Sequence, residues 1–197
     1  MKRPLLPIAA LCAAVTFTGC GSSSGSDDAD ERNTPVTSAS PSTTAEVTGG
    51  DDTALPDDVC KALDASAVAK AVGGKVTLSA QPGGDCSFQQ ADLRAISGGL
   101  GIDRDAVRSG GYDTYLSGLN MSMTKPTRHD VSHLGDHAAV LVGVPTMGSG
   151  DNLMAAGAVD EGDHLLTVTL VQGNGIAAEK LLAVATDLLT LLDEEIG

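Results

Sequence analysis

Three histidines at four-residue spacing are the side chains of this sequence best suited to hold a metal ion. His129, His133 and His137 follow one another at this interval, with Asp130 and Asp136 between them. On a helix, residues four apart lie on one face, so the three imidazoles would be able to share a zinc ion. A zinc ion held in this way would support a metal-dependent hydrolase.

The residues around these histidines do not favour a helix. Pro126 lies just upstream and Gly135 lies within the set, and both residue types disfavour helical structure. In a strand, residues four apart are separated by about 13 Å, which is too far for one metal with bonds of about 2 Å. We therefore expect surface or loop histidines, no catalytic residue, no metal and no other cofactor. The alternative is the hydrolase that uses His129, His133 and His137.

The N-terminal residues 1–19 have the layout of a lipoprotein signal peptide. Lys2 and Arg3 are followed by an uncharged, largely apolar run over 4–17, which is typical of a secretory signal. The run is shorter than the roughly 20 apolar residues that a membrane-spanning helix needs. The segment therefore predicts export.

Cys20 is the predicted lipidation site. The sequence Phe17-Thr18-Gly19-Cys20 resembles the bacterial lipobox, in which the cysteine is linked to diacylglycerol and becomes the new N-terminus. Phe17 departs from the usual Leu, and cleavage by an ordinary signal peptidase is the alternative. Acyl chains on Cys20 would anchor the protein firmly to a membrane.

Residues 20–55 are expected to form a disordered tether that begins at the lipidated cysteine. The segment consists mostly of Ser, Thr, Gly, Asp and Pro, and such a composition offers almost nothing to bury. The following residues, 56–197, are long enough for a single domain with its own core. We therefore place one folded domain behind the tether.

Cys60 and Cys86 are predicted to form a disulfide bond. Cys12 leaves with the signal peptide and Cys20 takes the lipid, so these two cysteines are the only pair that remains. An exported protein lies in an oxidising compartment, where disulfides persist. A reactive or metal-binding thiol is the alternative, but the two cysteines lack the close spacing of redox and zinc sites.

The charge of the chain excludes nucleic acid as a partner. The formal net charge is −14, and the residues from Asp57 onward carry 9 basic and 19 acidic side chains. Beyond the signal segment the aromatic residues are Phe88, Tyr112 and Tyr115. Nucleic-acid binders rely on cationic surfaces and on aromatic side chains that stack on bases, and this domain has few of either.

The elements of the domain suggest an α+β fold. Short helices are expected after Pro56 and after Asp64, the second ending at Gly73-Gly74, and a less regular helix is expected around Tyr112. Strands are expected at 75–80, 85–89, 93–102, 138–144, 153–159 and 164–172. The last two flank a turn at 160–163 that is typical of a hairpin.

The most regular pattern is at the C-terminal end. Apolar residues recur over 176–196 at the helical period, in a stripe wide enough to cover a sheet. We therefore predict a twisted, mainly antiparallel sheet with N-terminal short helices and a long C-terminal helix packed on it. Use of the stripe as a partner-binding face is the alternative.

Several short motifs resemble a known family. The segments 60–63, 67–69, 73–74 and 85–88, which read CKAL, AVA, GG and DCSF, and the turn VSHLGDHA at 131–138 are similar to those of the actinobacterial envelope lipoproteins grouped as domain of unknown function 3558. The similarity spans most of 57–195, although Phe88 stands where many relatives have Trp. The resemblance implies an envelope lipoprotein with a paired cysteine, and it brings no catalytic residues.

These observations together predict a lipid-anchored protein on the extracellular face of the cell membrane. With no convincing catalytic set, we expect a non-enzymatic binding or accessory module. Its expected partners are the membrane, through the lipid on Cys20, and either an envelope protein or a small ligand.

Overall fold

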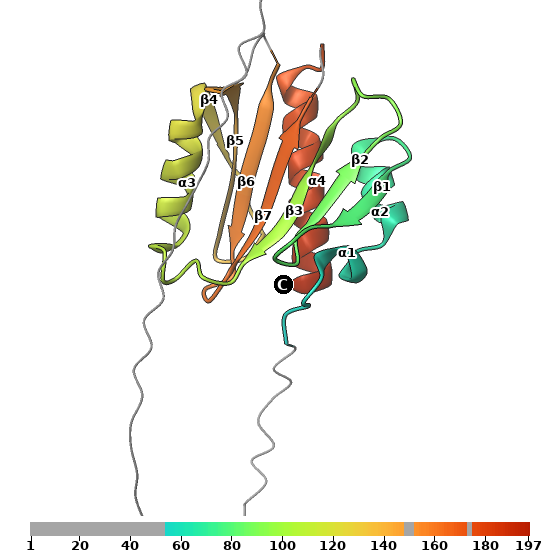
Figure 1. Ribbon diagram of the computed structural model, residues 1–197. Coiled ribbons are helices and arrows are strands. Elements are labelled where there is room, and N and C mark those ends of the chain that lie inside the picture. Colours follow the sequence, from blue (N-terminus) through green and yellow to red (C-terminus); the bar gives the residue numbers. More distant parts are fainter. Residues whose placement is uncertain (1–53, 148–151, 173–174) are drawn as a thin grey trace, which may run out of the picture. The chain divides into compact units, whose positions relative to one another are not determined.

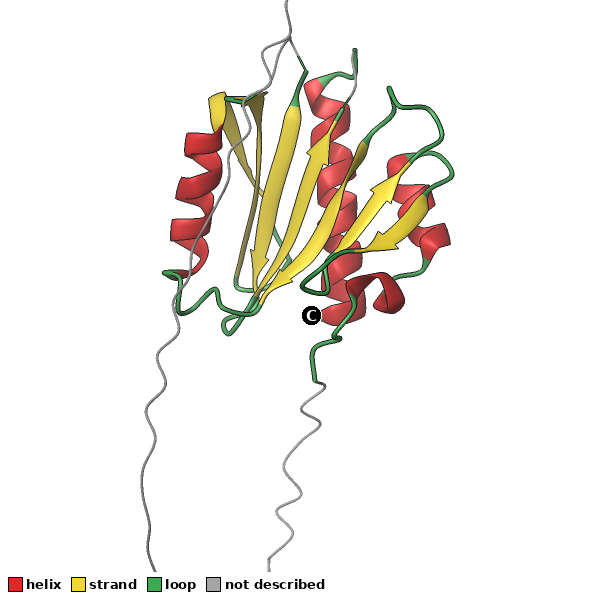
Figure 2. Cartoon of the chain, in the orientation of Figure 1, coloured by secondary structure: helices red, strands yellow, loops and turns green. Residues whose placement is uncertain are grey.

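The structure of this protein is a computed structural model that describes residues 54–147, 152–172 and 175–197. The predicted signal peptide, the lipidation site Cys20 and the tether up to residue 53 lie outside the described residues. The described residues form a seven-stranded sheet with helices on both faces (Figures 1 and 2). This architecture confirms the predicted α+β fold.

Every pairing between neighbouring strands of this sheet is antiparallel. In spatial order the strands run β1-β2-β3-β7-β6-β5-β4, so that β1 and β4 form the edges. Their bounds are β1 (Thr77–Ala80), β2 (Cys86–Gln89), β3 (Ser97–Asp103), β4 (Met123–Asp130), β5 (His137–Pro145), β6 (Met154–Asp160) and β7 (Leu165–Val171).

The helices begin and end where local chemistry favours it. They are α1 (Val59–Ala62), α2 (Ala65–Val72), α3 (Gly111–Ser122) and α4 (Ala178–Ile196). The side chains of Asp58 and Asp64 accept hydrogen bonds from the backbone two residues on and so cap α1 and α2. Gly73 ends α2 with φ 77°, a left-handed conformation that favours glycine.

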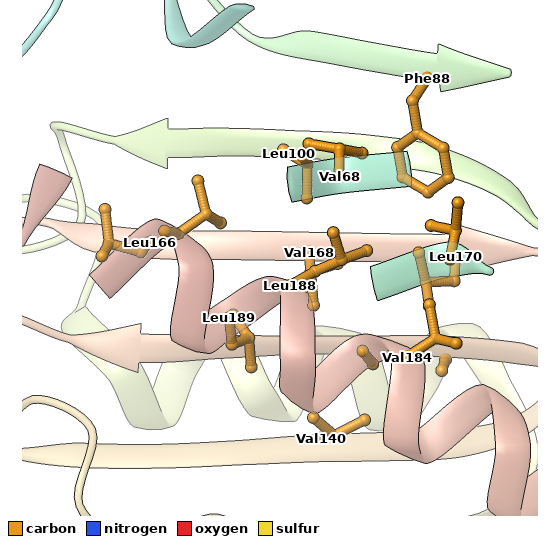
Figure 3. Packing of buried hydrophobic residues seen from close by; sticks show 14 of the residues in the cluster. Val68, Phe88, Leu100, Val140, Leu166, Val168, Leu170, Val184, Leu188 and Leu189 are labelled. Carbon is orange, nitrogen blue, oxygen red and sulfur yellow. The ribbon is translucent and has the colours of Figure 1, made fainter. Parts of the chain in front are cut away.

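The main core lies between the sheet and α4. This helix packs along β5, β6 and β7, and α2 lies beside it. Val184, Leu188 and Leu189 of α4 gather with Val140 and Val168 of the sheet (Figure 3). The position of α4 confirms the predicted packing of the C-terminal helix.

A smaller core lies on the opposite face of the sheet, where α3 packs over β4, β5 and β6. Tyr112 and Leu116 of α3 are buried there against Leu141 and Ala156 of the strands. The helix expected around Tyr112 is confirmed. Gly110, with φ 100°, stands at its N-cap, so the double glycine that breaks the helical pattern marks the start of the helix.

Two sequence predictions need correction. The segment 123–130 was not expected to be a strand, yet it forms the edge strand β4. Pro126 disfavours a strand because it cannot donate a ladder hydrogen bond, but an edge strand with a bulge tolerates it. The strand expected at 93–102 begins only at Ser97, because residues 91–95 form bends and turns.

The predicted disulfide is confirmed. Cys60 of α1 is bonded to Cys86 of β2, with their Cα atoms 4.8 Å apart. The bond attaches the N-terminal helices to the sheet. The expected hairpin between β6 and β7 is also present, and Gly162 supplies its positive φ of 86°.

Candidate functional site

The three spaced histidines lie in one hairpin formed by β4 and β5. His129 is on β4 opposite Val140, and His137 opens β5 opposite Asp160 of β6. His133 lies in the turn between the two strands, with a φ of 72°. The structure thus places the three side chains along a bend and not on a helix face.

The register separates the first histidine from the last. Directly paired residues share a face of the sheet, so His129 lies with Val140 on the α4 face. His137 lies on the opposite face, where its ring centroid is 6.0 Å from that of Tyr112. Among the residues that the structure describes, no three His, Cys, Asp or Glu side chains are grouped to hold a metal ion. The structure does not bring His129, His133 and His137 together.

The largest described cavity containing one of these histidines is a groove at the β4 edge of the sheet. It measures about 590 Å³ and lies between β4, the end of β5 and the first turns of α4. We call it the edge groove; its lining residues are Thr124, Lys125, Thr127, His129, Val142, Gly143, Val144, Leu153, Ala178, Glu179 and Leu182. Its volume is within the range of small-molecule sites, about 300–1,000 Å³.

The edge groove exists because α4 does not extend over the whole sheet. The helix packs mainly on β5, β6 and β7, so among the described residues no helix packs closely over the α4 face of the edge strand β4. The floor of the groove is apolar, with Val142, Leu153 and Leu182, and its rim carries Thr124 and Thr127. An apolar floor with a few polar groups at the rim is typical of a binding site.

A β-bulge decides which side chains reach the edge groove. Thr124 pairs with Val144 and Thr127 pairs with Val142, so β4 has one residue more than β5 across this step. One extra residue moves the following side chains to the other face of a sheet. His129 therefore faces the groove.

Gly143 allows this bulge to form. It lies opposite the inserted residues, and a Cβ at this position would be only 3.1 Å from the Cα of Pro126 and 3.2 Å from the Cβ of Met123. A Cβ there would make the two strands move apart by a few tenths of an ångström, so their close approach favours glycine at this position.

Lys125 in the bulge has a backbone conformation that costs energy. Its φ is 51°, in the left-handed region, where an L-residue is less stable by about 1–2 kcal/mol. Strained residues of this kind gather at functional sites, and an observed outlier supports a hypothesis of function. The strained residue here is also a wall of the edge groove.

A second, polar hollow of about 390 Å³ lies on the α3 side of the same hairpin. Arg128 donates from Nε to Oδ1 of Asp130 at 2.7 Å, and this bond raises the pKa of the guanidinium further. Burial raises the pKa of Tyr112 to about 12. The phenol is thus protonated at neutral pH and is not an acid–base group there.

A carboxyl pair lies at the other end of the sheet, where β6 turns into β7. Oε1 of Glu161 is buried and accepts no hydrogen bond from a described residue. Burial, together with the nearby carboxyl of Asp193 in α4, raises the pKa of Glu161 to about 7. The backbone N–H of Gly135 donates to Oδ1 of the same Asp193 at 3.3 Å. A proton on Glu161 would convert its carboxyl from an acceptor into a donor to Asp193.

Sequence reasoning identified only one residue of the edge groove, His129, and gave it a different role. Lys125, Val142 and Leu182 come from three segments that are far apart in the chain. The only local signal for the groove was Lys125-Pro126 in a polar segment. A proline in such a segment is compatible with a bulge and with a loop. The groove as a whole had no sequence signature.

The fold and the groove define a disulfide-linked α+β domain whose sheet edge and closing helix enclose a ligand-sized space. Comparisons of this chain with protein-family models, with curated proteins and with solved structures find no match. No described helix is long and apolar enough to cross a membrane.

Proposed function

We propose that this protein is a lipid-anchored, non-enzymatic binding module on the extracellular face of the cell membrane, and that it holds a small, largely apolar ligand in the edge groove. The observation that carries the proposal is the groove itself: about 590 Å³ of space with an apolar floor and a polar rim. The resemblance of a few short motifs, such as those at 60–63 and 131–138, to actinobacterial envelope lipoproteins agrees with this proposed setting.

Two features support export and anchoring. The sequence around Cys20 has the form of a lipobox behind a secretory signal. The disulfide between Cys60 and Cys86 is typical of proteins in oxidising compartments. Both features agree with a domain that works outside the cytoplasm.

The position of the groove relative to the start of the domain suits a tethered binding protein. Arg104, which follows the end of β3, donates a hydrogen bond to the carbonyl of Pro56. The groove is lined by the start of β4 and the end of β5, which lie at the opposite end of the sheet because β3 runs antiparallel to β7, and β7 to β6. The groove thus lies toward the end of the sheet opposite to Pro56, near the start of the described domain.

The alternative of a metal-dependent hydrolase has no support from the geometry, because His129 and His137 lie on opposite faces of the sheet.

The proposal is tested by filling the groove. The full chain with Cys20→Ala, which removes the lipid site, is purified from the exported fraction, and ligands retained by the protein are identified by native mass spectrometry. Leu182→Trp, in the apolar floor of the groove, is expected to abolish retention of apolar molecules. Leu191→Trp is the matched control, because it is also a partly buried leucine of α4 but does not line the groove. Equal ligand content in both variants and in the parent would contradict the proposal.

A further inference from the structure

The lysine and the histidine of the edge groove lie on one wall, and its acidic residue lies on the other. Lys125 and His129 both come from β4, whereas the acidic lining residue, Glu179, comes from the first turn of α4 on the other side. The groove is therefore polarised across its width. A ligand with one charged end would have a preferred orientation in it.

Lys125 is a cation without a partner on the described surface. Among the residues that the structure describes, no carboxylate lies within salt-bridge distance of its amino group. Arg128, on the same strand, is bonded to Asp130 on the opposite face. Lys125 is the lysine that lines the apolar edge groove, so its charge is available there for a ligand.

The backbone conformation of Lys125 suggests that its side chain has a role at this position. Lys125 has a φ of 51° and precedes Pro126, a combination that sterics disfavour for any residue with a side chain. Glycine would adopt the same conformation without strain. A lysine there has a charged side chain on the groove wall, which a glycine would not supply.

The chemistry of the floor defines the rest of the ligand. Val142, Leu153 and Leu182 present hydrocarbon, so the body of the ligand must be apolar to gain from burial. Thr127 and His129 add hydrogen-bonding groups next to Lys125 on β4. A carboxylate would accept hydrogen bonds from all three.

From these observations we infer that the edge groove binds a carboxylate with a hydrocarbon chain, with its anionic end at Lys125 and His129 and its chain against Val142, Leu153 and Leu182. This inference rests on the proposed function, because it names the ligand class of the same groove. It adds that the head group of the ligand is negatively charged and that it binds at the β4 wall of the groove.

The test compares three probes that share a ten-carbon chain and differ in the charge of the head group. Decanoate, 1-decanol and decylammonium are titrated by calorimetry, below their aggregation concentrations, into the full chain with Cys20→Ala at neutral pH. Decanoate is expected to bind at least about tenfold tighter than either of the others, since a hydrogen bond to a charged group contributes that much or more.

Variants then assign the charge to its residue. Lys125→Met keeps the length of the side chain and is expected to weaken decanoate binding by about tenfold while leaving 1-decanol unchanged. Lys125→Arg is expected to retain decanoate binding. Lys180→Met is the matched control, because Lys180 is an exposed lysine of α4 outside the groove lining.

The outcomes separate this inference from the proposed function. Equal binding of decanoate and 1-decanol, or an equal loss of both in Lys125→Met, would overturn the charge assignment and leave the groove as an apolar site. Tighter binding of decylammonium would reverse the sign and also overturn it. Absence of binding by all three probes, together with unchanged ligand retention in Leu182→Trp, would reject the groove as a ligand site altogether.

Discussion

At the scale of single residues, the most unusual environment is that of Glu161. Its carboxyl is partly buried and faces Asp193 of α4, Asp136 of the turn before β5 and Asp160 at the end of β6. Its Oε1 also lies close to Gly135, where an added Cβ would be only 2.8 Å away. Three elements therefore meet at one carboxyl. Burial and the neighbouring carboxyls disfavour a negative charge on Glu161 and so favour its neutral form.

This arrangement predicts a stability that depends on pH. The pKa of Glu161 is raised from its ordinary value of 4.5 to about 7. Its contribution to the free energy of unfolding is therefore fully present below about pH 4.5 and is lost as the pH rises through 7. Glu161→Gln, which is neutral at every pH, is expected to raise the melting temperature at pH 8 and to change it little at pH 5. Thermal unfolding followed by circular dichroism at both pH values measures this.

The control for that experiment is Glu195→Gln, which makes the same change in net charge at an exposed position of α4. It is expected to shift the melting temperature little at either pH. An equal gain from both variants at pH 8 would mean that overall charge, and not the pair with Asp193, is responsible.

Lys125 allows a second prediction at this scale. Lys125→Gly removes the left-handed strain of about 1–2 kcal/mol but adds the entropy cost of glycine, roughly 0.5–1 kcal/mol. We therefore expect the free energy of unfolding to rise by up to about 1.5 kcal/mol, as measured by chemical denaturation. A clear loss of stability would show that the lysine side chain is needed for the fold, and would weaken its assignment to ligand binding.

At the scale of elements, the disulfide and α4 hold the helices on the sheet. The Cys60–Cys86 bond closes a loop with a sequence separation of 26 and joins α1 to β2. Removal of this bond by Cys60→Ala with Cys86→Ala is expected to lower the free energy of unfolding by about 3 kcal/mol on the chain-entropy model. Urea unfolding of the variant and of the parent measures it. Equal midpoints would show that α1 remains docked without the bond.

The closing helix α4 makes the larger contribution to the core. Leu188 is fully buried between the helix and the sheet, and Leu188→Ala is expected to cost about 2–5 kcal/mol in unfolding free energy. Asp187→Ala, its exposed neighbour, is expected to change stability by no more than about 0.5 kcal/mol. Similar values for the two variants would contradict the packing of α4 described above.

At the scale of the whole molecule, the predicted anchor and the folded domain are separate in sequence. Cys20→Ala is expected to move the protein from the membrane fraction to the soluble exported fraction without a change in the melting temperature, because the core is built from residues beyond 54. Fractionation followed by immunoblotting measures the first effect. Persistence of the variant in the membrane fraction would contradict lipidation at Cys20.

Much of the fold was predictable because it follows from local patterns. The helical period over 176–196, the helix starts after Pro56 and Asp64, and the hairpin turn at 160–163 each depend on residues that are neighbours in the chain. The disulfide followed from counting the cysteines that remain after export. All of these features appear in the structure with shifts of a few residues.

The candidate site was not predictable, because it depends on which segments meet. Strand β4 was not predicted, because Pro126 and the bulge interrupt the alternation of its side chains between the two faces of the sheet. The bulge also determines that His129 faces α4 while Arg128 and Asp130 face α3. The raised pKa of Glu161 likewise requires Asp193 to be brought to it by the packing of α4.

The secondary structure of most of the domain, its disulfide and its acidic charge are predictable from the residues alone, because they depend on neighbouring residues or on counts. The placement of His129 and His137 on opposite faces, and of Lys125, Val142 and Leu182 around one space, depends on how the strands and α4 pack. The reason is physical: a strand pairing shifted by one residue exchanges the two faces of a sheet, and register is fixed by contacts between segments far apart in the chain.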